Sequence, residues 1–293
     1  MGGTTRFRTS RSWWRKRRDH RNGRPGSCPP ARIQRVTGNQ RGIEVMLEDK
    51  VAVIYGAGGS IGGAVARTFA REGARVFLAG RTEATLDAVA DDIRSHGGEA
   101  DTAIVDALDK QAVDEFVDAV VEETGRLDIS FNLVTYGDVQ KPLMEISVED
   151  FTYPITTATQ TQFLTTRTAA RHMIERESGV ILTFGGGGPQ TPPNLGGFKV
   201  SLDALESLRR QWAVELGPHG IRVVTLKTGG IPESILDDLP GREEIVAETR
   251  ADALLSHTAT LSDVGDVAAF VASDRGRTIT GTPVNVSCGA LVD

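Results

Sequence analysis

Short apolar, β-branched runs alternate with longer amphipathic stretches from Lys50 to the end of the chain. The short runs predict strands near residues 51–55, 75–79, 102–105, 128–133, 179–184, 221–226 and 283–287. The longer stretches have helical spacing near residues 61–72, 83–95, 110–124, 156–176, 200–216 and 263–273. Strands that alternate with helices pair in parallel, and continuous apolar runs are typical of strands covered on both faces. The pattern therefore predicts an α/β fold with one doubly wound parallel sheet.

Charge divides the chain into two unequal parts. The whole sequence holds 33 Lys and Arg against 39 Asp and Glu, yet residues 1–45 contain twelve basic and only two acidic residues. This segment shows neither helical nor strand periodicity, so we expect a disordered basic extension over residues 1–45 and a single domain over residues 46–293. A nucleic-acid-binding arm and an Arg-rich targeting peptide are the alternatives. A mis-assigned upstream start or an unselected extension is favoured, because Met46 begins the stretch that leads into the first predicted strand, which is a natural domain start. Nucleic acid is therefore not an expected partner.

Several classes of protein are disfavoured by what the sequence lacks. No uninterrupted apolar run approaches the roughly 20 residues that a membrane-spanning helix requires. The two cysteines, Cys28 and Cys288, fit neither a disulfide framework nor a zinc site, which favours a reducing, cytoplasmic location. His172 and His219 show no metal-ligand spacing with a carboxylate, so we expect no metal.

A glycine-rich turn follows the first predicted strand, in the order Tyr55-Gly56-Ala57-Gly58-Gly59-Ser60-Ile61-Gly62-Gly63. A strand, a glycine turn and a helix in this order can hold a pyrophosphate against the free N–H groups that begin the helix. The general G-x-G-x-x-G pattern fails, because its third glycine falls on Ile61. The spacing instead resembles the T-G-x-x-x-G-x-G signature of the short-chain dehydrogenase/reductase family, with Tyr55 in place of Thr and Ser60 in place of the middle Gly.

Other segments extend this resemblance over residues 47–293. Asp106 follows the third predicted strand where the family has an Asp that contacts adenine, and Asn132 matches the first Asn of its N-N-A-G motif. The stretches 209–223 and 271–290 are also similar to the family. The resemblance implies a Rossmann fold, a nicotinamide cofactor, a small-molecule substrate, and a homodimer or homotetramer formed through the two long helices.

The end of the second predicted strand bears on the choice of cofactor. An acidic residue there would bond the ribose hydroxyls of NAD, whereas Arg accommodates the 2′-phosphate of NADP. The strand here ends in Gly80-Arg81, so NADP(H) is preferred; NAD(H) stays possible if Glu83 or a water molecule serves the ribose. The residues expected to bind the cofactor are Gly56, Gly58, Ser60, Ile61, Gly62, Arg81, Asp106 and Asn132.

The resemblance fails at the positions that carry catalysis in the family. The family's Tyr and Lys, four residues apart, align with Phe198 and Leu202; its Ser aligns with Gly185 or Gly186, and its Asn with Ala158. No Tyr-x-x-x-Lys occurs anywhere in the chain. Lys199 does not replace the lysine, because adjacent helical positions point about 100° apart.

Substitute groups can be sought at the carboxyl ends of the predicted strands, where ligands bind in such sheets. Thr135, Tyr136, Thr183 and Thr228 are nearby, and Tyr136 is the best stand-in proton donor; the alternative is that its ring only packs at the rim of the cleft. The sequence therefore predicts an NADP(H)-dependent oxidoreductase that acts on an unknown carbonyl or activated C=C compound with a non-standard site. The alternative is a catalytically inactive NADP(H) sensor or hetero-oligomer partner. The loop near residues 230–256 resembles the family's substrate lid, but its mixed composition names no substrate.

Overall fold

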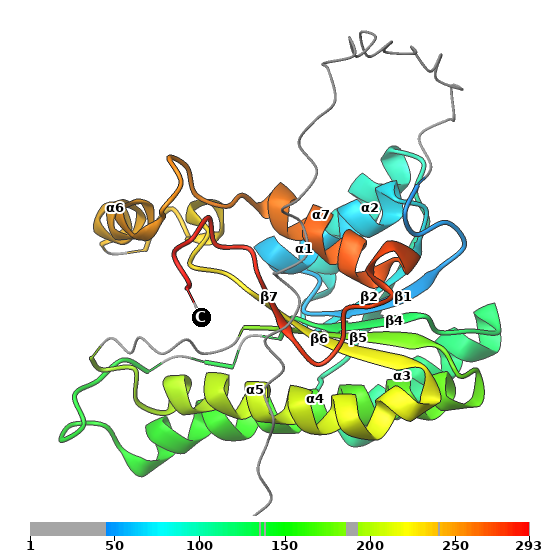
Figure 1. The fold of residues 1–293 in the computed structure, drawn as a ribbon, viewed down its shortest axis with the longest axis horizontal. Helices are drawn as coiled ribbons and strands as arrows, with labels where there is room; N and C mark the ends of the chain where they lie inside the picture. The colour runs from blue at the N-terminus through cyan, green and yellow to red at the C-terminus, as the bar shows by residue number, and fades with distance from the viewer. Residues whose placement is uncertain (1–44, 135, 138, 186–192, 240, 293) are drawn as a thin grey trace, which may run out of the picture. The chain divides into compact units, whose positions relative to one another are not determined.

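The computed structural model describes residues 45–134, 136–137, 139–185, 193–239 and 241–292, all of which belong to one compact unit, residues 43–293. The expected basic extension lies, apart from Val45, outside the described residues. The unit is built on a seven-stranded parallel sheet of order β3-β2-β1-β4-β5-β6-β7 (Figure 1). This arrangement confirms the predicted doubly wound α/β fold.

The strands are β1 Val51–Tyr55, β2 Arg75–Gly80, β3 Ala100–Ile104, β4 Ile129–Asn132, β5 Gly179–Phe184, β6 Ile221–Lys227 and β7 Pro283–Asn285. The helices are α1 Ser60–Arg71, α2 Glu83–Ser95, α3 Lys110–Thr124, α4 Val148–Glu175, α5 Gly196–Leu216, α6 Arg242–Asp252 and α7 Leu261–Ala272. Short 3-10 turns lie at η1 Gly217–His219, η2 Pro232–Ser234 and η3 Asp274–Gly276. Most strand and helix bounds match the sequence prediction to within two or three residues, because each element has a clear apolar period.

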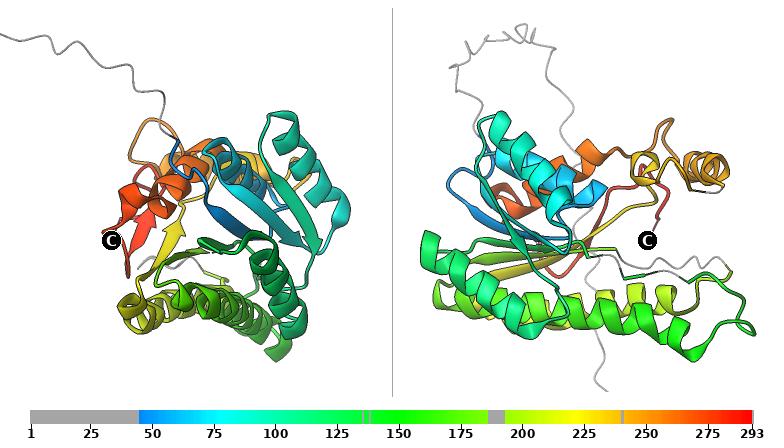
Figure 2. Two further views of the ribbon diagram at one scale, coloured as in Figure 1. Left: turned by 90° about the vertical axis from the view of Figure 1, so that its right-hand side faces the viewer. Right: turned by 180° about the vertical axis from the view of Figure 1, so that it is seen from behind.

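Two apolar cores lie on opposite faces of the sheet. Helices α1, α2 and α7 cover one face, and helices α3, α4 and α5 cover the other (Figures 1 and 2). Strand β1 serves both cores, because its side chains alternate: Ile54 joins the first core, and Val53 and Tyr55 join the second. The fully buried β1 explains why its sequence is apolar throughout.

Helix α4 begins at Val148, eight residues earlier than the sequence pattern indicates. Pro154 lies inside it and removes one backbone donor, so the pattern before it does not suggest a helix. Ser147 caps the start of the helix, where its hydroxyl accepts a hydrogen bond from the N–H of Asp150 (3.0 Å). Pro154 itself is buried.

Helix α6 forms where we expected only a lid loop. It follows Gly241, which has a positive φ of 77°, and it carries Glu243 and Glu244 in its first turn. Only Val246 is buried among its residues, so the helix has no apolar stripe from which the sequence could reveal it. Within the described ranges, no helix is long and apolar enough to cross a membrane.

Arg222 of β6 ties the end of α7 to the sheet. Its guanidinium donates to the backbone carbonyls of Val271, Ala272 and Ser273 at the end of α7, and to Ile279 before β7. We expect Arg222→Ala to lower the free energy of unfolding by about 2–4 kcal/mol, because these carbonyls lose a charged donor. Urea denaturation measures the change; an effect no larger than that of Arg210→Ala, an exposed position, would contradict this role.

Candidate functional site

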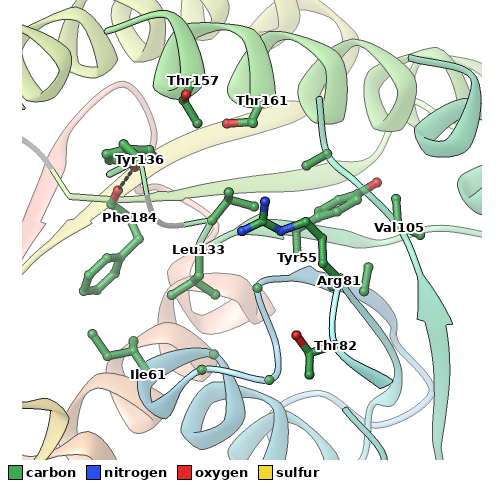
Figure 3. A pocket seen from close by; sticks show the side chains of 18 of the residues that line it. Tyr55, Ile61, Arg81, Thr82, Val105, Leu133, Tyr136, Thr157, Thr161 and Phe184 are labelled. Atoms are coloured by element: carbon green, nitrogen blue, oxygen red, sulfur yellow. Dashed lines mark hydrogen bonds between the residues drawn. The ribbon is translucent and has the colours of Figure 1, made fainter. Parts of the chain in front are cut away.

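A cavity of about 680 Å³ opens at the carboxyl ends of β1 to β5. It spans the point where the strand order turns outward from β1 in both directions, which is where ligands bind in doubly wound sheets. One end is lined by the loops after β1, β2 and β3; the other is lined by residues that follow β4 and β5 and by parts of α4, α5 and η2 (Figure 3).

The loop between β1 and α1 is too tight for side chains at two of its glycines. Gly56 has a φ of 76°, and a Cβ there would lie 2.6 Å from the carbonyl oxygen of Leu133. A Cβ on Gly62 would lie 2.2 Å from the carbonyl oxygen of Gly56. Both obstacles are backbone atoms, so the loop depends on glycine at these positions.

The start of α1 offers backbone donors to the cavity. Gly59 caps the helix without a side-chain hydrogen bond, and the N–H of Gly63 makes the first intrahelical bond, to the carbonyl of Gly59 (2.8 Å). The amides of Ser60, Ile61 and Gly62 therefore precede the helical ladder, and all three residues line the cavity with Gly58. With no acidic residue in the first turn, this end of the helix favours an anion.

Among the residues that the structure describes, two charged side chains line the cavity, Arg81 and Asp106. Arg81 is exposed directly after β2, has no hydrogen bond or ion pair among the described residues, and points into the cavity (Figure 3). Asp106 follows β3, and one of its carboxylate oxygens accepts a hydrogen bond from the N–H of Leu108 (3.0 Å). The structure thus brings together all but one of the residues expected to bind the cofactor.

The exception is Asn132, which is buried behind the cavity wall and does not line the cavity. Its amide nitrogen donates to the hydroxyl of Thr165 (3.1 Å), and its amide oxygen accepts from the N–H of Val134 (2.9 Å). Asn132 therefore shapes the turn containing Leu133 and Val134, which do line the cavity.

Tyr136 lies at the opposite end of the cavity from Arg81 (Figure 3). Its hydroxyl donates a hydrogen bond to the carbonyl of Phe184 at the end of β5 (2.6 Å). Burial raises the pKa of Tyr136 above its ordinary value, and a hydrogen bond with Gln162 opposes this only in part. Tyr136 thus lines the cavity, and its hydroxyl proton is engaged with a backbone carbonyl.

Phe198 and Leu202 line the same end of the cavity, one turn apart on α5. They pack on a small buried cluster of Tyr136, Ala158 and Leu205. Gly185 also lines this end, whereas Gly186 lies outside the described residues. Lys199 is not among the lining residues and instead bonds Asp203 at 2.6 and 2.7 Å.

Comparison with known proteins identifies the family. Residues 56–290 match the family model described as Enoyl-(Acyl carrier protein) reductase. The chain belongs to the short-chain dehydrogenase/reductase family. Family membership makes it an oxidoreductase by type and implies an NAD(P)(H) cofactor.

Relatives of this short-chain dehydrogenase/reductase span nearly its whole folded unit. It is 31% identical to an uncharacterized oxidoreductase of Mycobacterium tuberculosis over 83% of this chain and 92% of the relative. It is 29% identical to the A-factor type gamma-butyrolactone 1'-reductase of Streptomyces virginiae, over 84% of this chain and 97% of the relative. The crystal structure of a dehydrogenase/reductase from Sinorhizobium meliloti superposes with a TM-score of 0.75 at 28% identity, over 84% of this chain and 97% of that one.

Sequence reasoning missed a stripe of cavity residues on α4 of this short-chain dehydrogenase/reductase. Tyr153, Thr157 and Thr161 line the cavity, as does Ser234 from η2. The four-residue spacing of Tyr153, Thr157 and Thr161 could have predicted this, because it places the three α4 side chains on one helical face. Among the residues that the structure describes, no group of three or more His, Cys, Asp or Glu could hold a metal ion.

Tyr55 places an unsatisfied hydroxyl in the core beside this site. Its ring meets Phe116 edge to face at 5.8 Å, and its buried hydroxyl has no hydrogen-bond partner among the described residues. We expect Tyr55→Phe to raise the free energy of unfolding by about 1 kcal/mol, because it removes a desolvated, unbonded group. The matched control is Tyr136→Phe, which removes a bonded hydroxyl and should lower it by about 1 kcal/mol. Chemical denaturation measures the free energy of unfolding of both variants. Equal changes in the two variants would contradict the claim that only the Tyr55 hydroxyl is unbonded.

Proposed function

We propose that this protein is an NADP(H)-dependent oxidoreductase that acts on a carbonyl or activated C=C compound with a non-standard catalytic site. Arg81 carries the proposal: it is a cation without a partner among the described residues, it lines the cavity, and it stands directly after β2 where an NAD enzyme would need an acid. The S. virginiae relative is named a reductase, which supports a reductive direction.

The residues present fit the nucleotide. The glycines that pack without side chains suit a pyrophosphate, as do the unbonded amides at the start of α1, whose residues line the cavity. The hydroxyl of Ser60 adds a donor, Arg81 suits a 2′-phosphate, and Asp106 suits the amino group of adenine. When bound, NADPH would supply a hydride.

Arg81→Ala tests the choice of nucleotide. We expect this change to weaken NADPH binding by roughly 10- to 100-fold, because the 2′-phosphate loses a charged donor, and to leave NADH binding nearly unchanged. Fluorescence titration with both nucleotides measures the two dissociation constants. Arg210→Ala, at an exposed arginine outside the cavity, is the matched control and should alter neither. Equal losses for NADPH and NADH would refute the assignment.

The second candidate is an NADP(H)-binding sensor, or a partner in a hetero-oligomer, without catalysis. It is favoured by Phe198 and Leu202, which present no acid and no charge to the cavity. Tight NADPH binding with no NADPH oxidation by ketones, aldehydes or enones would support it. Tyr136 stays our prediction for the stand-in proton donor: turnover that survives Tyr136→Phe would remove it from that role.

A homodimer or homotetramer and a cytoplasmic location complete the proposal. Both rest on the sequence arguments above, and sedimentation of the purified protein tests the first. A monomer at micromolar concentration would contradict it.

A further inference from the structure

One face of α4 brings a row of hydroxyl groups to the cavity. Tyr153, Thr157 and Thr161 follow one another at four-residue intervals, and all three line the cavity. Figure 3 shows Thr157 and Thr161 on the side of α4 that faces the cavity. The row lies at the end of the cavity formed by parts of α4, α5 and η2, whereas the loops after β1, β2 and β3 form the other end. It therefore belongs to the part of the site that the nucleotide would leave to a substrate.

The hydroxyl of Thr157 has no hydrogen-bond partner among the described residues. A threonine inside a helix commonly donates its hydroxyl to a carbonyl of the preceding turn. On the same helix, Thr159 donates to the carbonyl of Ile155 (2.8 Å). Thr165 likewise donates to that of Thr161 (2.9 Å). Thr157 is only 6% exposed, and a buried hydroxyl without a partner is costly, so a ligand in the cavity is the group that would satisfy it.

Tyr153 places a second hydroxyl one turn before Thr157. The residue is 53% exposed, and its hydroxyl also has no partner among the described residues. Its ring packs on the backbone of Gly137, which has a φ of 80°, and a Cβ on this glycine would collide with the ring. Tyr136 differs, because its hydroxyl already donates to the carbonyl of Phe184. Tyr153 is thus held beside the cavity with its own hydroxyl still available.

Two available hydroxyls at this spacing suit a hydrogen-bond acceptor. The Cβ atoms of residues four apart on a helix lie about 5–6 Å from each other, so both hydroxyls can serve the same ligand group. A carbonyl oxygen has two lone pairs and no proton, so it can accept from both donors. Gly185, one of the two positions aligned with the family's serine, has no side chain that could donate. Phe198 and Leu202 line the same end and offer an apolar surface to the rest of the ligand.

We propose that Tyr153 and Thr157 are substrate-binding residues, whose hydroxyls donate hydrogen bonds to a carbonyl oxygen of the substrate while its apolar part lies against Phe198 and Leu202. The inference rests on the proposed oxidoreductase function and adds the residues that hold the substrate. It joins two observations, the unpartnered hydroxyl on a buried threonine and the unpartnered phenol one turn away on the same face of α4.

Two pairs of compounds test the proposal, benzylacetone with butylbenzene and acetophenone with ethylbenzene. Within each pair the carbon skeleton is the same, and only the ketone has a carbonyl oxygen. Binding is measured to the full-length protein saturated with NADP⁺, which has no hydride to transfer, by ligand-observed NMR titration. The measured quantity is the ratio of the hydrocarbon's dissociation constant to that of its ketone, which isolates the contribution of the oxygen.

Tyr153→Phe and Thr157→Val each remove one hydroxyl and nearly preserve the shape of the side chain. We expect each change to lower this ratio by about three- to tenfold, because the ketone loses one hydrogen bond and the hydrocarbon loses none. Thr156→Val is the matched control, since Thr156 is an exposed neighbour on α4 that does not line the cavity, and it should leave the ratio unchanged. Circular dichroism and NADP⁺ binding check that the variants fold.

The outcomes separate this inference from the proposed function. An unchanged ratio in both variants, or no binding of either ketone to the wild-type protein, would overturn the inference; a fall in only one variant would remove the other residue from it. NADPH oxidation by benzylacetone with an unchanged KM in both variants would also overturn it and leave the oxidoreductase function standing. A ratio that falls as expected, with no NADPH oxidation by any ketone, aldehyde or enone, would support the binding role and overturn the oxidoreductase function.

Discussion

Phe198→Tyr combined with Leu202→Lys should raise ketone reductase activity by about 10²- to 10⁴-fold, the usual contribution of positioned acid-base catalysis. The two positions lie one turn apart on α5 and face the same end of the cavity, so the new hydroxyl and ammonium would meet a bound ketone together. The lysine would lower the pKa of the tyrosine, because a nearby positive charge favours the phenolate. NADPH oxidation by benzylacetone measures the gain.

The control moves only the lysine. Phe198→Tyr with Val200→Lys has the same composition, but Val200 is exposed and does not line the cavity, so activity should stay near that of Phe198→Tyr alone. If the first pair binds NADPH normally and gains nothing, then Phe198 and Leu202 are not the equivalents of the family's tyrosine and lysine.

Gly62→Ala should abolish useful nucleotide binding, with a loss of about 100-fold or more in affinity for both NADPH and NADH. The added Cβ would lie 2.2 Å from the carbonyl oxygen of Gly56 and 2.9 Å from the Cα of Ala57. Since both are backbone atoms, the loop must move away from the start of α1, which displaces the residues there that line the cavity. Overpacking of this kind also costs about 1–3 kcal/mol of stability.

Gly217→Ala is the matched control for that change. Gly217 has an ordinary helical φ of −56°, and no atom lies within 4 Å of the Cβ it would gain. Its replacement should leave nucleotide binding intact and stabilise the fold by about 0.4–1 kcal/mol, because the unfolded chain loses freedom. Nucleotide affinity retained in Gly62→Ala would show that the loop does not hold the phosphates.

The sequence alone was sufficient for the sheet and for most of the residues that line the cavity end formed by the loops after β1, β2 and β3. The strand bounds follow from continuous apolar runs, since a strand covered on both faces must be apolar along its whole length. Gly56, Ser60, Gly62 and Arg81 could be assigned because their positions are set locally, by one strand end and the turn beside it. The charge of Arg81 could be interpreted from the sequence for the same reason, because Arg81 directly follows β2 and its position is therefore fixed by that strand end.

The other end of the cavity was decided by tertiary structure, because its residues come from segments far apart in the chain. The hydrogen bond from Tyr136 to Phe184 joins residues 48 positions apart, and no local pattern reveals that the tyrosine's proton is already engaged. The sequence predicts that Asn132 binds the cofactor, yet its hydrogen bonds with Thr165 and Val134 hold it behind the cavity wall. Helix α6 could not be predicted from the sequence, because its single buried residue produces no helical hydrophobic period. The sequence thus determined which side chains are present and which of them follow each strand. Only the packing of β4, β5, α4 and α5 against one another determined which of these side chains are available to bind a ligand.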